Sequence, residues 1–233
     1  MSEPFLEVVQ PPGEARAIAL VLHGGRARST EPVRERHLTV VRMKPFVTAL
    51  VRDGARHGLT VARLRYAVRG WNGDKQSPLA DVRHALDQLT GTFPALPIAL
   101  VGHSMGGRAA LHEAGHRNVE SIIALAPWIE RGDPLDRLRG RRVLIAHGTR
   151  DRTTSPKASA ALAAHLQGIA ASATFVAVHR DGHGLIRRAS FWHELTSGYV
   201  LATLCDVPAS ESVGPEAANV VEKVLAGEPV LDV

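Results

Sequence analysis

Six short apolar runs separated by segments of helical periodicity constrain the fold of this chain more than any other feature of its sequence. Most of the runs are too continuous for strands with one exposed face and are typical of strands buried on both faces. The runs are residues 17–22, 59–64, 98–101, 121–126, 143–146 and 174–178. We therefore expect a sheet that is covered on both sides.

The segments between the runs carry apolar residues that recur on one helical face. Alternation of strands and helices predicts βαβ units, a parallel sheet and right-handed crossovers. The fold class expected is α/β, with a mostly parallel central sheet flanked by helices, and ligands then bind outside the carboxyl ends of the strands. The helical faces are Phe46, Val47, Leu50 and Val51; Leu79, Val82, Leu86 and Leu89; Ala158, Ala161, Leu162, His165 and Leu166; and Phe191, Trp192, Leu195, Tyr199 and Leu204.

The chain has 233 residues, enough for one α/β domain with a sizeable core. We assign residues 1–206 to that domain. From Val207 onward the sequence is acidic, and apolar spacing at Val220, Val221 and Val224 predicts a short helix. This tail, 207–233, could pack on the body, contact a partner such as a second copy of the chain, or fray, and the sequence leaves the three open.

Charge and cysteine content exclude several classes of protein. The net charge is +5 and rests on 24 arginines and four lysines that are spread along the chain, while aromatic residues make up only 4%. A nucleic-acid footprint would gather basic and aromatic residues on one face, so we expect no nucleic-acid partner. The single cysteine, Cys205, excludes an intrachain disulfide. With no signal-peptide pattern at the start and no apolar run near 20 residues, we expect a cytoplasmic protein without a membrane span.

A glycine-flanked serine follows the third apolar run. Residues 102–106 read GHSMG and fit G-x-S-x-G, and a helical segment comes directly after them. At a sharp strand-to-helix turn, side chains two places before or after Ser104 would clash, so glycine is needed there. The N–H groups at the start of the helix suit a negative charge that develops nearby. The alternative is a plain glycine turn with a surface serine.

A serine hydroxyl needs a base, and the base needs an orienting acid. Asp151 follows the run at 143–146, and His183 follows the run at 174–178 between two glycines. The order along the chain is therefore Ser104, Asp151, His183. Glu130 is a second choice for the acid, whereas Asp181 is better explained as a loop-forming aspartate.

A glycine loop follows the first run as His23-Gly24-Gly25-Arg26. Such a loop can present a backbone N–H opposite that of Met105 and so complete a pocket for an oxyanion. His23 would brace this loop. The alternative is a glycine turn of the same geometry without a catalytic task.

HGG, GHSMGG, GTRD and DGH, in this order and each beyond a strand, resemble the α/β-hydrolase fold over about residues 15–205. The resemblance implies Ser104 as nucleophile, Asp151 as acid and His183 as base. It also implies an oxyanion hole formed by the N–H groups of Gly25 and Met105, with Arg26 as the alternative to Gly25.

Only residues 127–142 join the fourth and fifth runs, which is too short for a large cap domain. The chain therefore resembles the capless dienelactone-hydrolase-like or small serine esterase branch, although dienelactone hydrolases carry cysteine at the position of Ser104. The function implied is a serine hydrolase, carboxylesterase-like, that cleaves a small carboxylic ester or thioester without metal or organic cofactor. A peptidase or acyltransferase of the same fold, and a non-catalytic ligand-binding protein on this scaffold, are the alternatives.

The segment 26–42 is long, polar and rich in arginine, and we expect it to overhang the site. Arg26, Tyr66, Trp71 and Trp128 are the predicted substrate-binding residues, with Arg69 beside them. The aromatic side chains could equally pack loops. The arginines suggest tolerance for anionic substrates.

Overall fold

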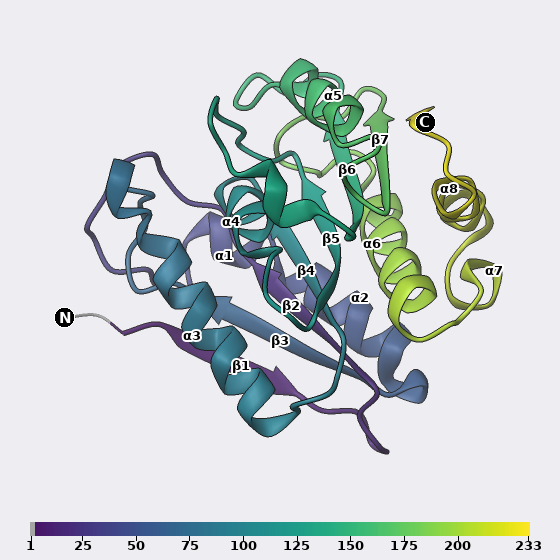
Figure 1. Cartoon of the computed structure of the whole chain (residues 1–233), viewed down its shortest axis with the longest axis horizontal. Helices are drawn as coiled ribbons and strands as arrows, with labels where there is room; N and C mark the ends of the chain where they lie inside the picture. Colours follow the sequence, from purple (N-terminus) through teal and green to yellow (C-terminus); the bar gives the residue numbers. More distant parts are fainter. Residues whose placement is uncertain (1–2) are drawn as a thin grey trace.

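A computed structural model describes residues 3–233, in which eight strands form one sheet (Figure 1). The strand order is β1-β3-β2-β4-β5-β6-β7-β8, and every pairing is parallel except that of the edge strand β1 with β3. The strands are β1 (Phe5–Val9), β2 (Ala17–Leu22), β3 (Leu59–Arg65), β4 (Ile98–His103), β5 (Val119–Leu125), β6 (Arg142–Gly148), β7 (Ser172–Val178) and β8 (Val230–Asp232). The predicted fold class is confirmed.

Helices cover both faces of the sheet and enclose two hydrophobic layers. Ile18, Leu20 and Leu22 of β2 belong to one layer, which includes residues of the helices α3 (Ser77–Thr92), α4 (Met105–Glu113) and α5 (Pro156–His165). Ala17, Ala19 and Val21 belong to the other layer, which includes residues of the helices α2 (Lys44–Gly54), α6 (Ala189–Leu204) and α8 (Pro215–Leu225). Alternate residues of a strand point to opposite faces, and both faces are apolar here, which explains the continuous apolar runs.

The helices are α1 (Leu38–Val41), α2 (Lys44–Gly54), α3 (Ser77–Thr92), α4 (Met105–Glu113), α5 (Pro156–His165), α6 (Ala189–Leu204), α7 (Ala209–Ser212) and α8 (Pro215–Leu225), with 3₁₀ turns at Ala55–His57, Gly73–Lys75 and Leu135–Leu138. The six predicted runs become β2 to β7, several of them longer than predicted. The connection between β5 and β6 holds one 3₁₀ turn and no separate cap domain. Within residues 3–233, no helix combines the length and the apolar character needed to span a membrane.

The tail from Val207 packs on the body of the protein. Helix α8 lies against α6 and buries Val220, Val221 and Val224. Strand β8 then pairs with β7, so the last residues of the chain extend the central sheet. The sequence left open whether the tail packs on the body, contacts a partner or frays, and in the structure it packs on the body.

Candidate active site

Ser104 lies at the sharp turn between β4 and α4, with φ 56° and ψ −118°. This positive φ is unusual for a residue other than glycine and raises the side chain above the end of the strand. A Cβ on Gly102 would collide with the carbonyl group of Gly106, and one on Gly106 would collide with the carbonyl group of Leu22. Both glycines of the motif are therefore required by close backbone approach.

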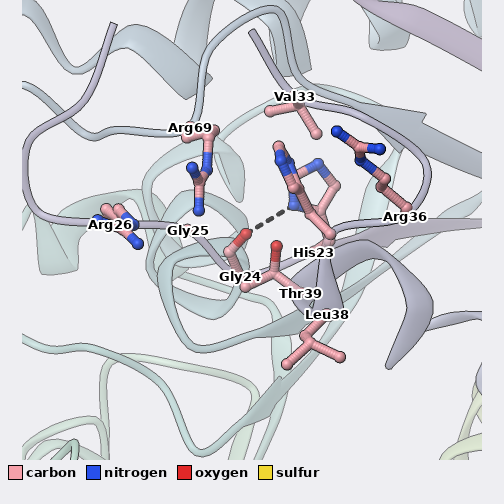
Figure 2. Close-up of a pocket in the computed structure, with 10 residues that line it drawn as sticks. His23, Gly24, Gly25, Arg26, Val33, Arg36, Leu38, Thr39 and Arg69 are labelled. Atoms are coloured by element: carbon pink, nitrogen blue, oxygen red, sulfur yellow. Dashed lines mark hydrogen bonds between the residues drawn. The ribbon is translucent and has the colours of Figure 1, made fainter. Parts of the chain in front are cut away.

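The loop after β2, whose Gly24 and Gly25 are labelled in Figure 2, comes close to this serine. A Cβ on Gly24 would lie 3.3 Å from the Cβ of Ser104, and one on Gly25 would collide with the Met105 side chain. The Arg26 amide donates to the carbonyl oxygen of Arg69 at 2.8 Å, so that amide is already used. Gly25 is thus better suited than Arg26 to offer a free N–H opposite that of Met105.

His23 braces this loop from beneath. Its Nε2 accepts the Tyr66 amide at 3.2 Å, so Nδ1 carries the proton and donates to the carbonyl oxygen of Gly24 at 2.6 Å. Burial lowers the pKa of His23 to about 4, and the imidazole is neutral at pH 7. This position suits the bracing part expected from the sequence.

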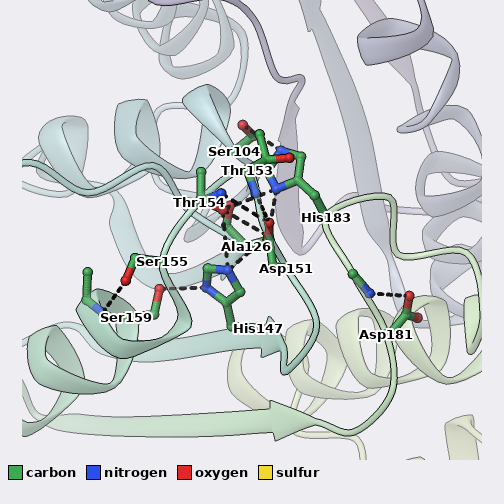
Figure 3. A network of polar contacts seen from close by, with 12 residues as sticks. Ser104, Ala126, His147, Asp151, Thr153, Thr154, Ser155, Ser159, Asp181 and His183 are labelled. Carbon is green, nitrogen blue, oxygen red and sulfur yellow. Dashed lines mark hydrogen bonds and ion pairs between the residues drawn. The ribbon is translucent and has the colours of Figure 1, made fainter.

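The three side chains predicted for catalysis meet at the carboxyl ends of β4, β6 and β7 (Figure 3). The Nε2 of His183 lies 3.1 Å from the Oγ of Ser104, and its Nδ1 lies 2.7 Å from the Oδ2 of Asp151. An ionised carboxylate only accepts hydrogen bonds, so Nδ1 carries the proton. The lone pair of Nε2 then faces the serine hydroxyl, which is the arrangement that proton abstraction needs.

Asp151 is held by backbone and side-chain donors. The amides of Thr153 and Thr154 donate to its Oδ1 at 2.7 and 3.0 Å, and the Thr154 hydroxyl donates to its Oδ2 at 2.9 Å. Burial by itself would raise the pKa of Asp151. The hydrogen bonds from His147, His183 and these amides outweigh burial and hold the pKa well below its usual range. The carboxylate is therefore ionised beside His183.

Comparison with known proteins finds no matching family model and no matching curated protein. Solved structures do match. A serine hydrolase homologue from Coxiella burnetii is 17% identical, with 84% of this chain and 91% of that chain covered and a TM-score of 0.64. Est1E from Butyrivibrio proteoclasticus is 14% identical, with 87% and 95% covered and a TM-score of 0.65. A serine hydrolase without a lid from Xanthomonas campestris is 21% identical, with 79% and 82% covered and a TM-score of 0.58.

This chain has the α/β-hydrolase fold. The likeness extends over most of the chain, and the Xanthomonas protein shares the lack of a lid. At these identities the comparison establishes the architecture of an α/β-hydrolase, whereas activity has to be argued from the site.

Sequence reasoning missed a second imidazole that contacts Asp151. His147, fully buried at the end of β6, places its Nε2 3.0 Å from the Oδ2 of Asp151 and its Nδ1 2.8 Å from the Oγ of Ser159. The carboxylate requires an N–H on Nε2, so Nδ1 accepts from the serine. The spacing of four residues in HGTRD was the available signal, because the segment turns back at the strand end.

His103, the second residue of GHSMG, was also missed. Its ring lies 4.8 Å from the ring of His183, and its Nε2 donates to the carbonyl oxygen of His183 at 2.9 Å. Arg42 donates to the same oxygen at 3.3 Å. Burial first, and then the charge of His183, lowers the pKa of His103 to about 3. The neutral ring and Arg42 hold the His183 loop against the nucleophile turn.

The prediction that Tyr66 and Trp71 bind substrate is wrong, because both side chains are buried. Tyr66 is 0% exposed and packs its ring against His23, and Trp71 is 3% exposed. The rings of Trp71 and Trp128 instead cover the guanidinium of Arg108, at 4.2 and 4.6 Å from its central carbon. These contacts are the loop-packing alternative, because aromatic faces attract a guanidinium group.

The acidic residues that compete with Asp151 lie elsewhere. Glu130 pairs with Arg108 at 3.0 Å and is half exposed. Asp181 accepts the amides of Gly182 and Arg188 and the indole N–H of Trp192, which fixes the turn that leads into α6. Asp181 therefore stabilises the loop, as the sequence predicted.

The segment 26–42, expected to overhang the site, lies beside the glycine loop. It forms the wall of a pocket of about 440 Å³ whose floor is the glycine loop, and Arg26 and Arg69 both line this pocket. On the other side, Leu38 and Val41 face the His183 loop across a smaller, apolar hollow of about 280 Å³ that also includes Ile186.

Proposed function

We propose that this α/β-hydrolase is a serine hydrolase that cleaves a small carboxylic ester or thioester through an acyl-enzyme intermediate. The observation that carries the proposal is the continuous contact from Ser104 through His183 to an ionised Asp151. A serine acquires nucleophilic character at neutral pH from such a base, and the base is kept in the required tautomer by the acid.

In the proposed reaction the Oγ of Ser104 attacks the carbonyl carbon while Nε2 of His183 takes the hydroxyl proton. The oxyanion accepts hydrogen bonds from the amides of Met105 and Gly25. Collapse of the tetrahedral intermediate breaks the bond to the leaving group, which receives the proton from His183. Water, activated by the same imidazole, then hydrolyses the acyl-enzyme and regenerates Ser104.

The strained backbone at Ser104 supports this proposal. Its φ of 56° combined with a ψ of −118° lies outside the left-handed helical region and costs free energy, which is typical of a residue held in place at a functional site. Of the proteins with the same architecture, the one from Coxiella is described as a serine hydrolase homologue and the one from Xanthomonas as a member of the serine hydrolases, in agreement with this choice of chemistry.

A fluorophosphonate probe, which reacts with activated serines, tests the proposal. We expect the native protein to be labelled and Ser104→Ala to be unlabelled. Ser210→Ala, which removes an exposed hydroxyl at α7, should be labelled like the native protein. A folded native protein that takes no label would instead indicate a ligand-binding protein on this scaffold.

A further inference from the structure

We propose that the pocket beside the glycine loop holds an anionic group of the substrate, a carboxylate or a phosphate, a few bonds from the scissile carbonyl. This inference deepens the proposed function and rests on it. The pocket has about 440 Å³, room for a short charged substituent, and opens between the glycine loop and the segment 26–42. The lining residues that matter for this inference are Gly24, Gly25, Arg26, Arg36, His37 and Arg69.

The charged side chains of this lining are all basic. Arg26, Arg36 and Arg69 line the pocket, and Figure 2 shows Arg36 and Arg69 on opposite sides of it. Among the residues that the structure describes, no aspartate or glutamate is part of the lining. Guanidinium groups present paired N–H donors that fit carboxylate and phosphate oxygens, so the lining has the chemistry of an anion site.

The nearby glutamates leave most of this positive charge uncompensated. Glu31 pairs with Arg69 at 2.5 Å but is 68% exposed, and Glu35 is turned away toward Arg63 and Arg65 at 3.1 and 3.3 Å. Within residues 3–233, no ion pair involves Arg26 or Arg36. Two guanidinium groups are thus free for a ligand.

The pKa of His37 indicates a positive electrostatic potential at the wall of the pocket. Its pKa is lowered by burial and then by the charges of Arg69, Arg34 and Arg36. Three arginines therefore act on one lining residue, and they would act in the opposite sense on an anion placed there.

The pocket is adjacent to the reacting centre. Gly24 lines it, and a Cβ at that glycine would be 3.3 Å from the Cβ of Ser104. Gly25, whose amide we propose as an oxyanion donor, lines it too. A carbonyl group bound at the oxyanion hole therefore has one of its substituents within reach of this pocket.

Two matched chromogenic esters test the proposal. Mono-4-nitrophenyl adipate carries a free carboxylate, and methyl 4-nitrophenyl adipate has the same chain without the charge. We expect the native enzyme to have the higher kcat/KM for the anionic ester. Arg36→Gln should lower this preference about tenfold, mostly through KM, and leave the neutral ester unaffected. Arg36→Lys should retain part of it.

Arg56→Gln is the matched control, because it removes the same charge at a distance from the pocket. Arg56 lies just before the amino end of β3, whereas the pocket lies at the carboxyl ends of the strands. Arg56→Gln should leave the preference unchanged. A native preference for the neutral ester, or equal losses in Arg36→Gln and Arg56→Gln, would overturn the proposal. Raised ionic strength should weaken turnover of the anionic ester alone.

A binding experiment keeps this inference separable from the proposed function. Calorimetry on Ser104→Ala should show monomethyl adipate bound about tenfold more tightly than to Ser104→Ala/Arg36→Gln. Competition by methyl phosphate against monomethyl adipate then tells whether phosphate or carboxylate is preferred. If the native protein binds the anion but takes no fluorophosphonate label, the hydrolase proposal is wrong and the anion site stands. If the native protein is labelled but no anion binds, the anion-site proposal is wrong.

Discussion

The Nε2 of His147 lies 3.0 Å from the Oδ2 of Asp151, the same carboxylate oxygen that His183 contacts at 2.7 Å. Loss of the His147 donor would leave this carboxylate less compensated and less firmly placed. We predict that His147→Asn lowers kcat about tenfold with little change in KM, since outer partners of catalytic groups have effects of this size.

The same variant should move the pH profile. A less compensated Asp151 stabilises the protonated form of His183 more strongly, so the acid limb of kcat/KM should shift to higher pH. Profiles of the native protein, His147→Asn and His165→Asn check this, because His165 is exposed at the end of α5. An unshifted limb in His147→Asn would mean that His147 serves stability alone.

The choice of acid separates Asp151 from Glu130. Asp151→Asn should lower kcat on a 4-nitrophenyl ester by about three to four orders of magnitude, because an amide favours the wrong tautomer of His183. Glu130→Gln should have little effect on kcat, as this carboxylate contacts Arg108 and not His183. Steady-state kinetics of both variants check the assignment, and the opposite pattern would reverse it.

The sequence predicted strands where both faces are buried and missed them at the edges. β2 to β7 appear as apolar runs because each contacts a helical layer on both sides. Four of the five residues of β1 are exposed, so its pattern lacks the apolar signal. β8 has three residues and buries only Leu231. Its place beside β7 depends on α8, a tertiary relationship that no local pattern encodes.

The candidate site was predictable where chemistry fixes residue type at a strand end. Ser104, Asp151 and His183 each follow a recognisable run, and parallel strands bring their carboxyl ends together. Tyr66 and Trp71 were misjudged because a loop position says little about the direction of a side chain. Tyr66 is 0% exposed and packs against His23, and Trp71 is 3% exposed and packs against Arg108. Both partners come from other segments of the chain.

Two buried histidines make stability depend on pH above the range of the carboxylates. Burial lowers the pKa of His23 to about 4 and that of His103 to about 3, from 6.5. The unfolded chain takes up these protons near pH 6.5, whereas the folded chain does not. The free energy of unfolding is therefore unaffected by these histidines above that pH. On acidification below it, the free energy of unfolding falls by about 1.4 kcal/mol per pH unit for each histidine.

Urea unfolding between pH 7 and pH 4.5 measures this slope. His23→Gln, which can still accept the Tyr66 amide, should reduce the slope by about 1.4 kcal/mol per pH unit. His165→Gln, on the surface, should leave it as in the native protein. Equal slopes in all three proteins would contradict a neutral, buried His23.

Substitution by alanine should have opposite effects on stability at two glycines, one at the nucleophile turn and one in α3. A Cβ on Gly102 meets the backbone of Gly106 and Gly107, which cannot move without displacing α4. Gly102→Ala should therefore lose at least 3 kcal/mol of stability or fail to fold. Gly91→Ala, in open space within α3, should gain up to about 1 kcal/mol. Thermal unfolding and labelling at Ser104 compare the two.

Helix α8 supplies the last prediction, through two of its own residues. Val221 is 0% exposed in the layer shared with α6, whereas Leu225 is 48% exposed. Val221→Ala should cost about 2 kcal/mol in the free energy of unfolding, and Leu225→Ala less than about 0.5 kcal/mol. Because α8 lies on the opposite face of the sheet from α4, kcat should be unchanged in both. Equal, small losses would indicate that the tail is frayed in solution or reserved for a partner.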